Sequence, residues 1–156
     1  MNPKKQLKYN NLKERQKLSW EGMFYSTQRM DLLIITISGG GIYAALEVLK
    51  YLQDYPLLLC KSTVLIKAAG ILLLFSIIAN FISQYFGHKS NREDWLMTDC
   101  ELEGVLKKKT PEIKASIKAH DKKAEKFTKL TRYTNNTSMI LMIVGLLALL
   151  LVFLIF

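Results

Sequence analysis

The chain has few of the residues that build disulfide frameworks or metal sites. Its 156 residues include two cysteines, Cys60 and Cys100, two histidines, His88 and His120, and three prolines. Two cysteines are too few for a secreted disulfide scaffold, and the topology predicted below puts them on opposite sides of a bilayer. The two histidines are far apart in the sequence and have no partners at ligand spacing, so no metal site is expected.

Catalytic motifs are missing as well. The run Ser38-Gly39-Gly40-Gly41 lacks the Lys-Ser/Thr pair of a phosphate-binding loop, and no Ser or Cys nucleophile motif is present. Neither histidine follows an arginine at the spacing of the Arg-x(4–6)-His pattern of helical ribonucleases. We therefore predict that the chain is not an enzyme and uses no cofactor.

Charge is absent from three long stretches of the chain, or nearly so. Residues 139–156 form a run of 18 residues without a charge, an Asn, a Gln or a Ser. At ~1.5 Å rise per residue, such a helix spans most of a ~30 Å hydrocarbon core. Two further apolar runs occupy about 31–52 and 63–86. The sequence predicts an all-α integral membrane protein with three transmembrane helices, the third at 136–156.

The basic residues predict how these helices are oriented. Lys and Arg number 7 in residues 1–30 and 12 in residues 87–135, and only Lys50, Lys61 and Lys67 lie between these segments. Positive charge favours the cytoplasmic side, so both basic segments are expected there. The prediction is a multi-pass protein of the cell inner membrane with a cytoplasmic N-terminus and an external C-terminus.

About three amphipathic cytoplasmic helices are expected in the basic segments. Residues 1–30 are predicted to form one, lying along the membrane surface or packed on the other helices. Gly87 is expected to end the second span, and Ser90–Glu93 fits a capping box that would start a new helix. Residues 110–111, Thr then Pro, predict another helix start, and residues 135–138 predict a cap or turn before the third span.

Small and polar residues inside the two spans of the predicted hairpin are candidates for function. Three consecutive glycines, Gly39, Gly40 and Gly41, predict either close packing of helices or a bend that lines a pore. Ser76, Asn80 and Ser83 form a polar stripe in the second span. Such a stripe either bonds a neighbouring helix or lines a path for water.

Two charges lie in the outer parts of the same two spans. Glu47 and Lys67 are costly if they face lipid, so they could form a membrane charge pair. Alternatively, both side chains reach out to the interface. A subunit interface or a pore mouth would use the same residues.

The helix expected after residue 110 has a short apolar stripe. Its members follow 4-3-4-3-4 spacing with lysine-rich flanks, which predicts packing against a helix of the same chain or of a neighbouring subunit. Because no aromatic platform accompanies the basic residues, nucleic acid is not an expected partner. We call this stripe the seam: Ile113, Ile117, His120, Ala124, Phe127 and Thr131.

The layout resembles the small membrane effectors of prokaryotic antiviral defence. The resemblance lies in the basic segment 13–29, the hairpin 31–86 and the charged helices 90–132. Two groups are similar: the SLATT-type effectors, a two-span hairpin with cytoplasmic helices, and the small membrane accessory protein of type VI-B CRISPR loci. The third span departs from the first group, and the missing Arg/His pattern departs from the second. The resemblance implies pore formation by an assembled membrane protein.

These observations predict a pore-forming or membrane-perturbing effector that acts as a homo-oligomer in the lipid bilayer. A different hypothesis is a membrane-anchored adaptor whose seam binds a cytoplasmic protein partner of a defence system. A third is a holin-like protein, since holins are small, cross the membrane several times and carry charge at one end.

Overall fold

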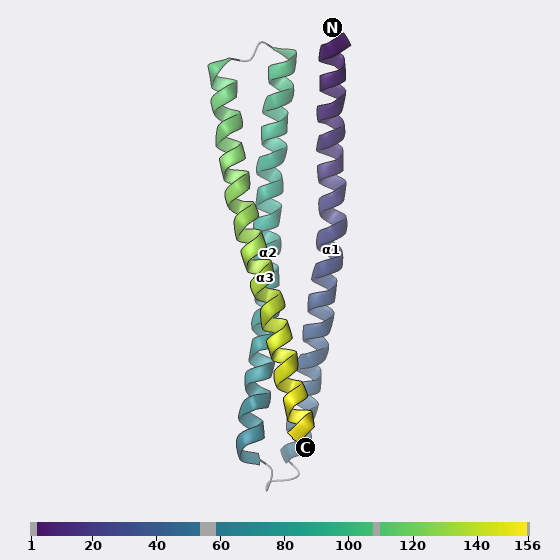
Figure 1. Cartoon of the computed structure of the whole chain (residues 1–156), viewed down its shortest axis with the longest axis vertical. Helices are drawn as coiled ribbons and strands as arrows, with labels where there is room; N and C mark the ends of the chain where they lie inside the picture. Colours follow the sequence, from purple (N-terminus) through teal and green to yellow (C-terminus); the bar gives the residue numbers. More distant parts are fainter. Residues whose placement is uncertain (1–2, 54–58, 108–109, 156) are drawn as a thin grey trace. The chain divides into compact units, whose positions relative to one another are not determined.

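The computed structural model describes residues 3–53, 59–107 and 110–155, and nearly all of them are helical. Three helices follow one another along the chain: α1 (Pro3–Gln53), α2 (Leu59–Leu106) and α3 (Pro111–Ile155) (Figure 1). The prediction of an all-α fold is confirmed for these ranges.

Each helix is longer than a bilayer requires. α1 has 51 residues, α2 has 48 and α3 has 45. At ~1.5 Å per residue each measures roughly 70 Å, more than twice a ~30 Å hydrocarbon core. The stretches long and apolar enough to cross a membrane lie within Asp31–Tyr51, Thr63–Leu106 and Pro111–Val152. Their number agrees with the three predicted spans.

The helices contribute to two compact units. Unit 1 combines Met1–Gln28 with Gln84–Arg132, and unit 2 combines Arg29–Ser83 with Tyr133–Phe156. Unit 2 therefore gathers the three apolar segments. Unit 1 has 18 of the 22 Lys and Arg residues of the sequence. Each unit takes a segment from all three helices.

The predicted helix start at Ser90 is wrong. α2 continues through Gly87 and the Ser90–Glu93 segment without a break. The Ser90 hydroxyl does not cap its own helix but donates a 3.0 Å hydrogen bond to the carbonyl oxygen of Ala124 in α3. A hydroxyl that finds a partner on another helix no longer favours a helix end, so the local capping signal loses to tertiary contact.

Two other predicted boundaries are wrong for the same kind of reason. α1 runs without interruption from Pro3 to Gln53, so residues 3–30 are not a separate helix. α3 likewise runs through 135–138, where a cap or turn was expected. Ser138, the last of those residues, is fully buried and bonds α2 instead of a helix end. The expected additional cytoplasmic helices are thus continuations of the three long ones.

The predicted boundary between α2 and α3 is confirmed. α2 ends at Leu106, directly before the lysine run, of which Lys108 and Lys109 lie outside the described residues. α3 begins at Pro111, and the Thr110 hydroxyl accepts a 3.3 Å hydrogen bond from the backbone N–H of Ile113. This is the N-cap geometry that a Thr-Pro pair favours, with Pro at the first helical position.

The core of unit 2 is built from apolar residues of all three helices. Leu73 and Ile66 of α2 are completely buried, and many large apolar side chains point outward instead, as expected of helices that face lipid. The buried cluster comprises Ala45, Ile66, Ala69, Leu73, Leu149 and Val152.

Candidate functional site

A layer of three serine hydroxyls lies at the centre of unit 2. Ser38 of α1, Ser76 of α2 and Ser138 of α3 are all fully buried. The Ser76 hydroxyl donates to the Ser138 carbonyl oxygen at 2.8 Å, and the Ser138 hydroxyl donates to the Ser76 carbonyl oxygen at 2.8 Å. The Ser38 hydroxyl lies 3.5 Å from that of Ser76. We call this set the serine layer. Hydrogen bonds between helices in lipid contribute about 0.6 kcal/mol each, with values up to ~2.

The rest of the predicted polar stripe faces the same way. Asn80 is completely buried, and Ser83 is 5% exposed. Both follow Ser76 on one face of α2, at spacings of four and three residues. The stripe of the second span therefore points into the chain's own bundle.

Close packing surrounds Leu73, one turn of α2 before the serine layer. A Cβ at Gly41 of α1 would lie 2.7 Å from Leu73 Cδ1. A Cβ at Gly145 of α3 would lie 2.8 Å from Leu73 Cγ and 3.3 Å from the carbonyl oxygen of Ala69. Leu73 thus fills the space left by two glycines on two different helices, which lets those backbones approach closely.

The three consecutive glycines of α1 do not share one role. Only Gly41 contacts the core. A Cβ built at Gly39 or at Gly40 would meet no described atom within 4 Å. The helix passes through all three without a positive φ. Gly41 therefore serves packing within the chain, whereas Gly40 leaves a small, open position on the outside of unit 2.

Glu47 and Lys67 both belong to unit 2, and both are exposed. The two residues are described by the structure, and no ion pair joins their side chains within 4.0 Å. The membrane charge pair weighed from the sequence does not form inside the chain.

The seam on α3 packs in part against α2 within unit 1. Ala124 is buried, and its carbonyl oxygen accepts hydrogen bonds from Ser90 on α2 and from Thr128. The rings of Phe127 and Phe86 stack with centroids 6.4 Å apart. The seam thus packs in the same chain, one of the two arrangements that the sequence left open. The apolar seam residues Ile113 and Ile117 are half-buried.

His120 of the seam has an acidic partner. Its Nδ1 lies 2.7 Å from Oε2 of Glu93, and both side chains are about four-fifths buried, with 22% and 17% exposed. The ion pair between Lys129 and Glu125 on α3 is largely exposed, unlike that of His120. Its Lys129 Nζ lies 2.7 Å from Glu125 Oε1. A hydrogen bond from the Lys129 ammonium lowers the pKa of Glu125 from its ordinary value.

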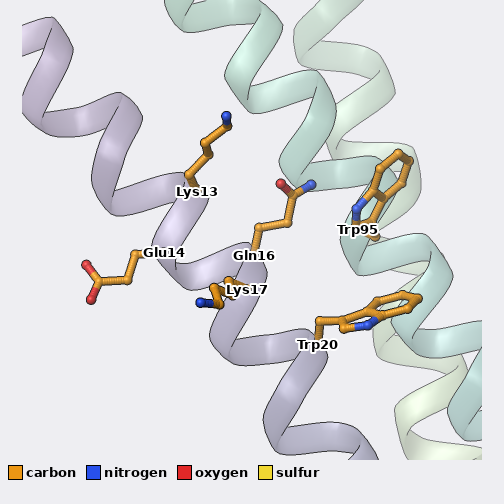
Figure 2. A pocket seen from close by; sticks show the side chains of 6 residues that line it. All are labelled: Lys13, Glu14, Gln16, Lys17, Trp20 and Trp95. Carbon is orange, nitrogen blue, oxygen red and sulfur yellow. The ribbon is translucent and has the colours of Figure 1, made fainter.

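Unit 1 has an open groove of about 500 Å³ between α1 and α2. Figure 2 shows Gln16 and Trp20 pointing from α1 toward α2, which contributes Trp95. Both indole rings are about half exposed. Lys13, Glu14 and Lys17 complete the lining. The groove combines two aromatic surfaces with charge of both signs. Among the described residues, no group of three or more His, Cys, Asp or Glu is placed to hold a metal ion.

Comparisons with protein-family models, with curated proteins and with solved structures find no match for this chain.

Several residues of the site were not singled out from the sequence. Ser38 and Ser138 are the partners of Ser76, and both lie in stretches of uncharged sequence. For Ser38 a signal existed, because Ile34, Ser38 and Ala45 fall on one buried face of α1. Glu93 was assigned to a cap, and Gly145 was one apolar residue among many.

Proposed function

We propose that this chain is a subunit of a homo-oligomeric membrane pore that acts as an effector in prokaryotic antiviral defence. The observation that carries the proposal is the contrast between the inside and the outside of unit 2. The serine layer, Asn80 and Ser83 are buried within the chain, whereas Gly40, Glu47 and Lys67 are exposed on its outer surface.

The buried polar residues support an oligomer over a single-chain channel. The serine layer joins all three helices, and Leu73 fills the space between Gly41 and Gly145. A single chain packed in this way has its polar groups engaged with one another. A path for ions would then lie between copies of the chain, lined by their outer faces.

The assignment to antiviral defence comes from the layout. A membrane hairpin flanked by charged helical segments resembles the small membrane effectors of such systems, although here these segments continue the membrane helices. The predicted topology places unit 1, with most of the Lys and Arg residues, in the cytoplasm. There it is accessible to a trigger produced during infection.

The adaptor hypothesis has less support, because part of the seam packs against α2 in the same chain. What remains in its favour is the groove with Trp20 and Trp95, since exposed aromatic side chains are common at protein interfaces (Figure 2). No observation favours the holin-like alternative over the pore.

The test is membrane potential in bacteria, followed with a voltage-sensitive dye after induced expression. The wild-type chain is expected to depolarise the cells, and Gly40→Leu is expected to abolish depolarisation. A leucine at this position meets no described atom within 4 Å of its Cβ, so the fold of a single chain tolerates it while the outer face changes. Both proteins must be compared at equal membrane levels.

A matched control separates the outer face from the core. Gly39→Leu also meets open space at its Cβ, but the side chain points about 100° away around α1. It is expected to leave most of the depolarisation intact. If Gly40→Leu depolarises cells as fully as the wild type, the pore proposal is wrong.

A further inference from the structure

The contacts between α1 and α2 define which residues lie at the same depth. Ser38 lies opposite Ser76, and Gly41 lies opposite Leu73. Moving three residues toward the C-terminus on α1 therefore corresponds to moving three residues toward the N-terminus on α2. Glu47 comes six residues after Gly41, and Lys67 comes six residues before Leu73. The two charges therefore lie at the same depth, roughly 6 Å by helix rise from the ends of the two apolar stretches at Tyr51 and Thr63.

These charges are at equal depth but do not meet. Both side chains are exposed, and no ion pair joins them within the chain. In a bilayer, opposite charges in the outer part of a span are costly unless each finds a partner or reaches the interface. Any second copy of this chain offers each charge a partner of opposite sign at the same depth.

We propose that Glu47 of one copy pairs with Lys67 of the next, in a head-to-tail interface that closes into a ring. This inference rests on the homo-oligomer of the proposed function and names its interface. Copies in a ring are related by rotation about the membrane normal, which leaves the depth of every residue unchanged. Equal depth is thus the condition that such a pair has to meet.

The helix faces that carry the two charges are in register with each other. On α1, Gly40 and Glu47 are seven residues apart on one exposed face, and Tyr43, which is 66% exposed, lies between them. On α2, Lys67 and Leu74 are also seven residues apart, and Leu74 is 50% exposed. When Glu47 meets Lys67, Leu74 of the neighbour lies at the depth of Gly40. The exposed α1 face is Thr36, Gly40, Tyr43 and Glu47, and the exposed α2 face is Lys67, Ile71, Leu74 and Ile78.

This arrangement makes the interface heterologous. One copy contributes its α1 face, where Gly40 leaves space beside Tyr43, and the next contributes large apolar side chains of α2 that pack there. Because the two faces lie on different helices, a pair of copies joined by one contact still has one free face of each kind. Repeated contacts of this kind close a ring when the rotation allows it.

The experiment is disulfide crosslinking between two differently tagged chains that are coexpressed in bacteria. Both carry Cys60→Ser and Cys100→Ser, one carries Glu47→Cys and the other Lys67→Cys. Oxidation in isolated membranes is expected to give a covalent dimer that carries both tags. The control replaces Lys67→Cys with Ala68→Cys, which is also exposed but points about 100° away around α2. It is expected to give at least about tenfold less product.

Charge reversal provides a second readout on chains with their native cysteines. The amount of oligomer captured by a lysine-independent crosslinker is expected to fall about tenfold in Glu47→Lys and in Lys67→Glu. The double variant Glu47→Lys/Lys67→Glu is expected to recover it, because the pair is restored with the charges exchanged. Expression level and membrane insertion are measured for all three variants.

The possible outcomes are distinct. A mixed-tag dimer with recovery in the double variant supports the interface. Dimers formed only between two Glu47→Cys chains would show an isologous contact and overturn the ring. No mixed-tag dimer, with single reversals that leave the oligomer intact, would mean that both charges only reach lipid headgroups. Depolarisation without the mixed-tag dimer refutes this interface and keeps the pore, whereas the dimer without depolarisation keeps the interface and refutes the pore.

Discussion

The packing of Leu73 between two glycines predicts a stability difference between two identical substitutions. Gly145→Ala places a Cβ 2.8 Å from Leu73 Cγ and 3.3 Å from the Ala69 carbonyl oxygen. Leu73 has little room to move away, because a Cβ at Gly41 on the opposite helix would also lie within 3 Å of it. The clash at Gly145 therefore requires a shift of helix backbones.

The magnitude follows from comparison with a glycine in open space. Overpacking a tight core costs about 1–3 kcal/mol. Replacing glycine by alanine within a helix also gains about 1 kcal/mol from helix propensity. Gly40→Ala receives the same gain without a clash, since its Cβ meets no described atom within 4 Å. The difference between the two variants cancels the propensity, so Gly145→Ala should be less stable than Gly40→Ala by about 1–3 kcal/mol.

The assay is unfolding in mixed micelles under increasing SDS. Ala45 is buried in the core of unit 2, and Ala45→Cys in a Cys60→Ser/Cys100→Ser background reacts with maleimide only when that core opens. The labelling midpoint then reports the stability of unit 2. Leu73→Ala added to Gly145→Ala should remove the clash and reduce its cost in a double-mutant cycle. Equal midpoints for Gly145→Ala and Gly40→Ala would refute the packing that we describe.

Three further predictions concern other parts of the chain. Ser76→Ala removes a donor from the serine layer and should lower the stability of unit 2 by about 0.6–2 kcal/mol, measured by the same labelling, while Thr137→Ala, whose hydroxyl bonds only its own helix, should change it far less. His120→Ala leaves Glu93 largely buried without its partner and should cost about 1–3 kcal/mol, whereas Lys129→Ala breaks an exposed pair and should change the stability far less. Thermal unfolding followed by the fluorescence of Trp20 and Trp95 distinguishes the two variants, and equal shifts would contradict the burial of the first pair. Lys107→Cys in a Cys60→Ser/Cys100→Ser background should react with a membrane-impermeant maleimide in inside-out vesicles and not in intact cells, and labelling in intact cells would reverse the predicted topology.

The parts of the fold that depend on local sequence were predicted correctly. The three apolar helices follow from the length of uncharged runs such as 139–156. The start of α3 follows from Thr110 and Pro111, whose preferences act within one turn of the chain. Neither needs knowledge of what the helix touches.

The errors occur where a residue with a local preference found a partner on another helix. Ser90 and Ser138 both fit a helix boundary by local pattern, yet each hydroxyl bonds a carbonyl oxygen of a different helix. Which hydroxyl meets which carbonyl depends on the register between two helices, and a single sequence does not contain that register. For the same reason Ser76 was noticed as a polar residue in a span, but its partner Ser138 was not.

The division of the glycine run is a second instance. The sequence shows Gly39, Gly40 and Gly41 as one feature, with packing and pore lining as rival interpretations. The structure puts Gly41 against Leu73 and leaves Gly40 on the outside of unit 2. Adjacent residues on a helix point about 100° apart, so one run can serve two surfaces. The rotation of α1 decides which residue faces which surface.

The most direct test of the pore is electrical recording from purified protein in a planar lipid bilayer. We expect discrete conductance steps for the wild-type chain and none for Gly40→Leu at the same protein-to-lipid ratio. Steps of equal size and frequency from both proteins would contradict a pore formed between the outer faces of neighbouring copies. A silent bilayer with the wild-type chain, under conditions in which the crosslinked oligomer is present, would contradict the pore itself.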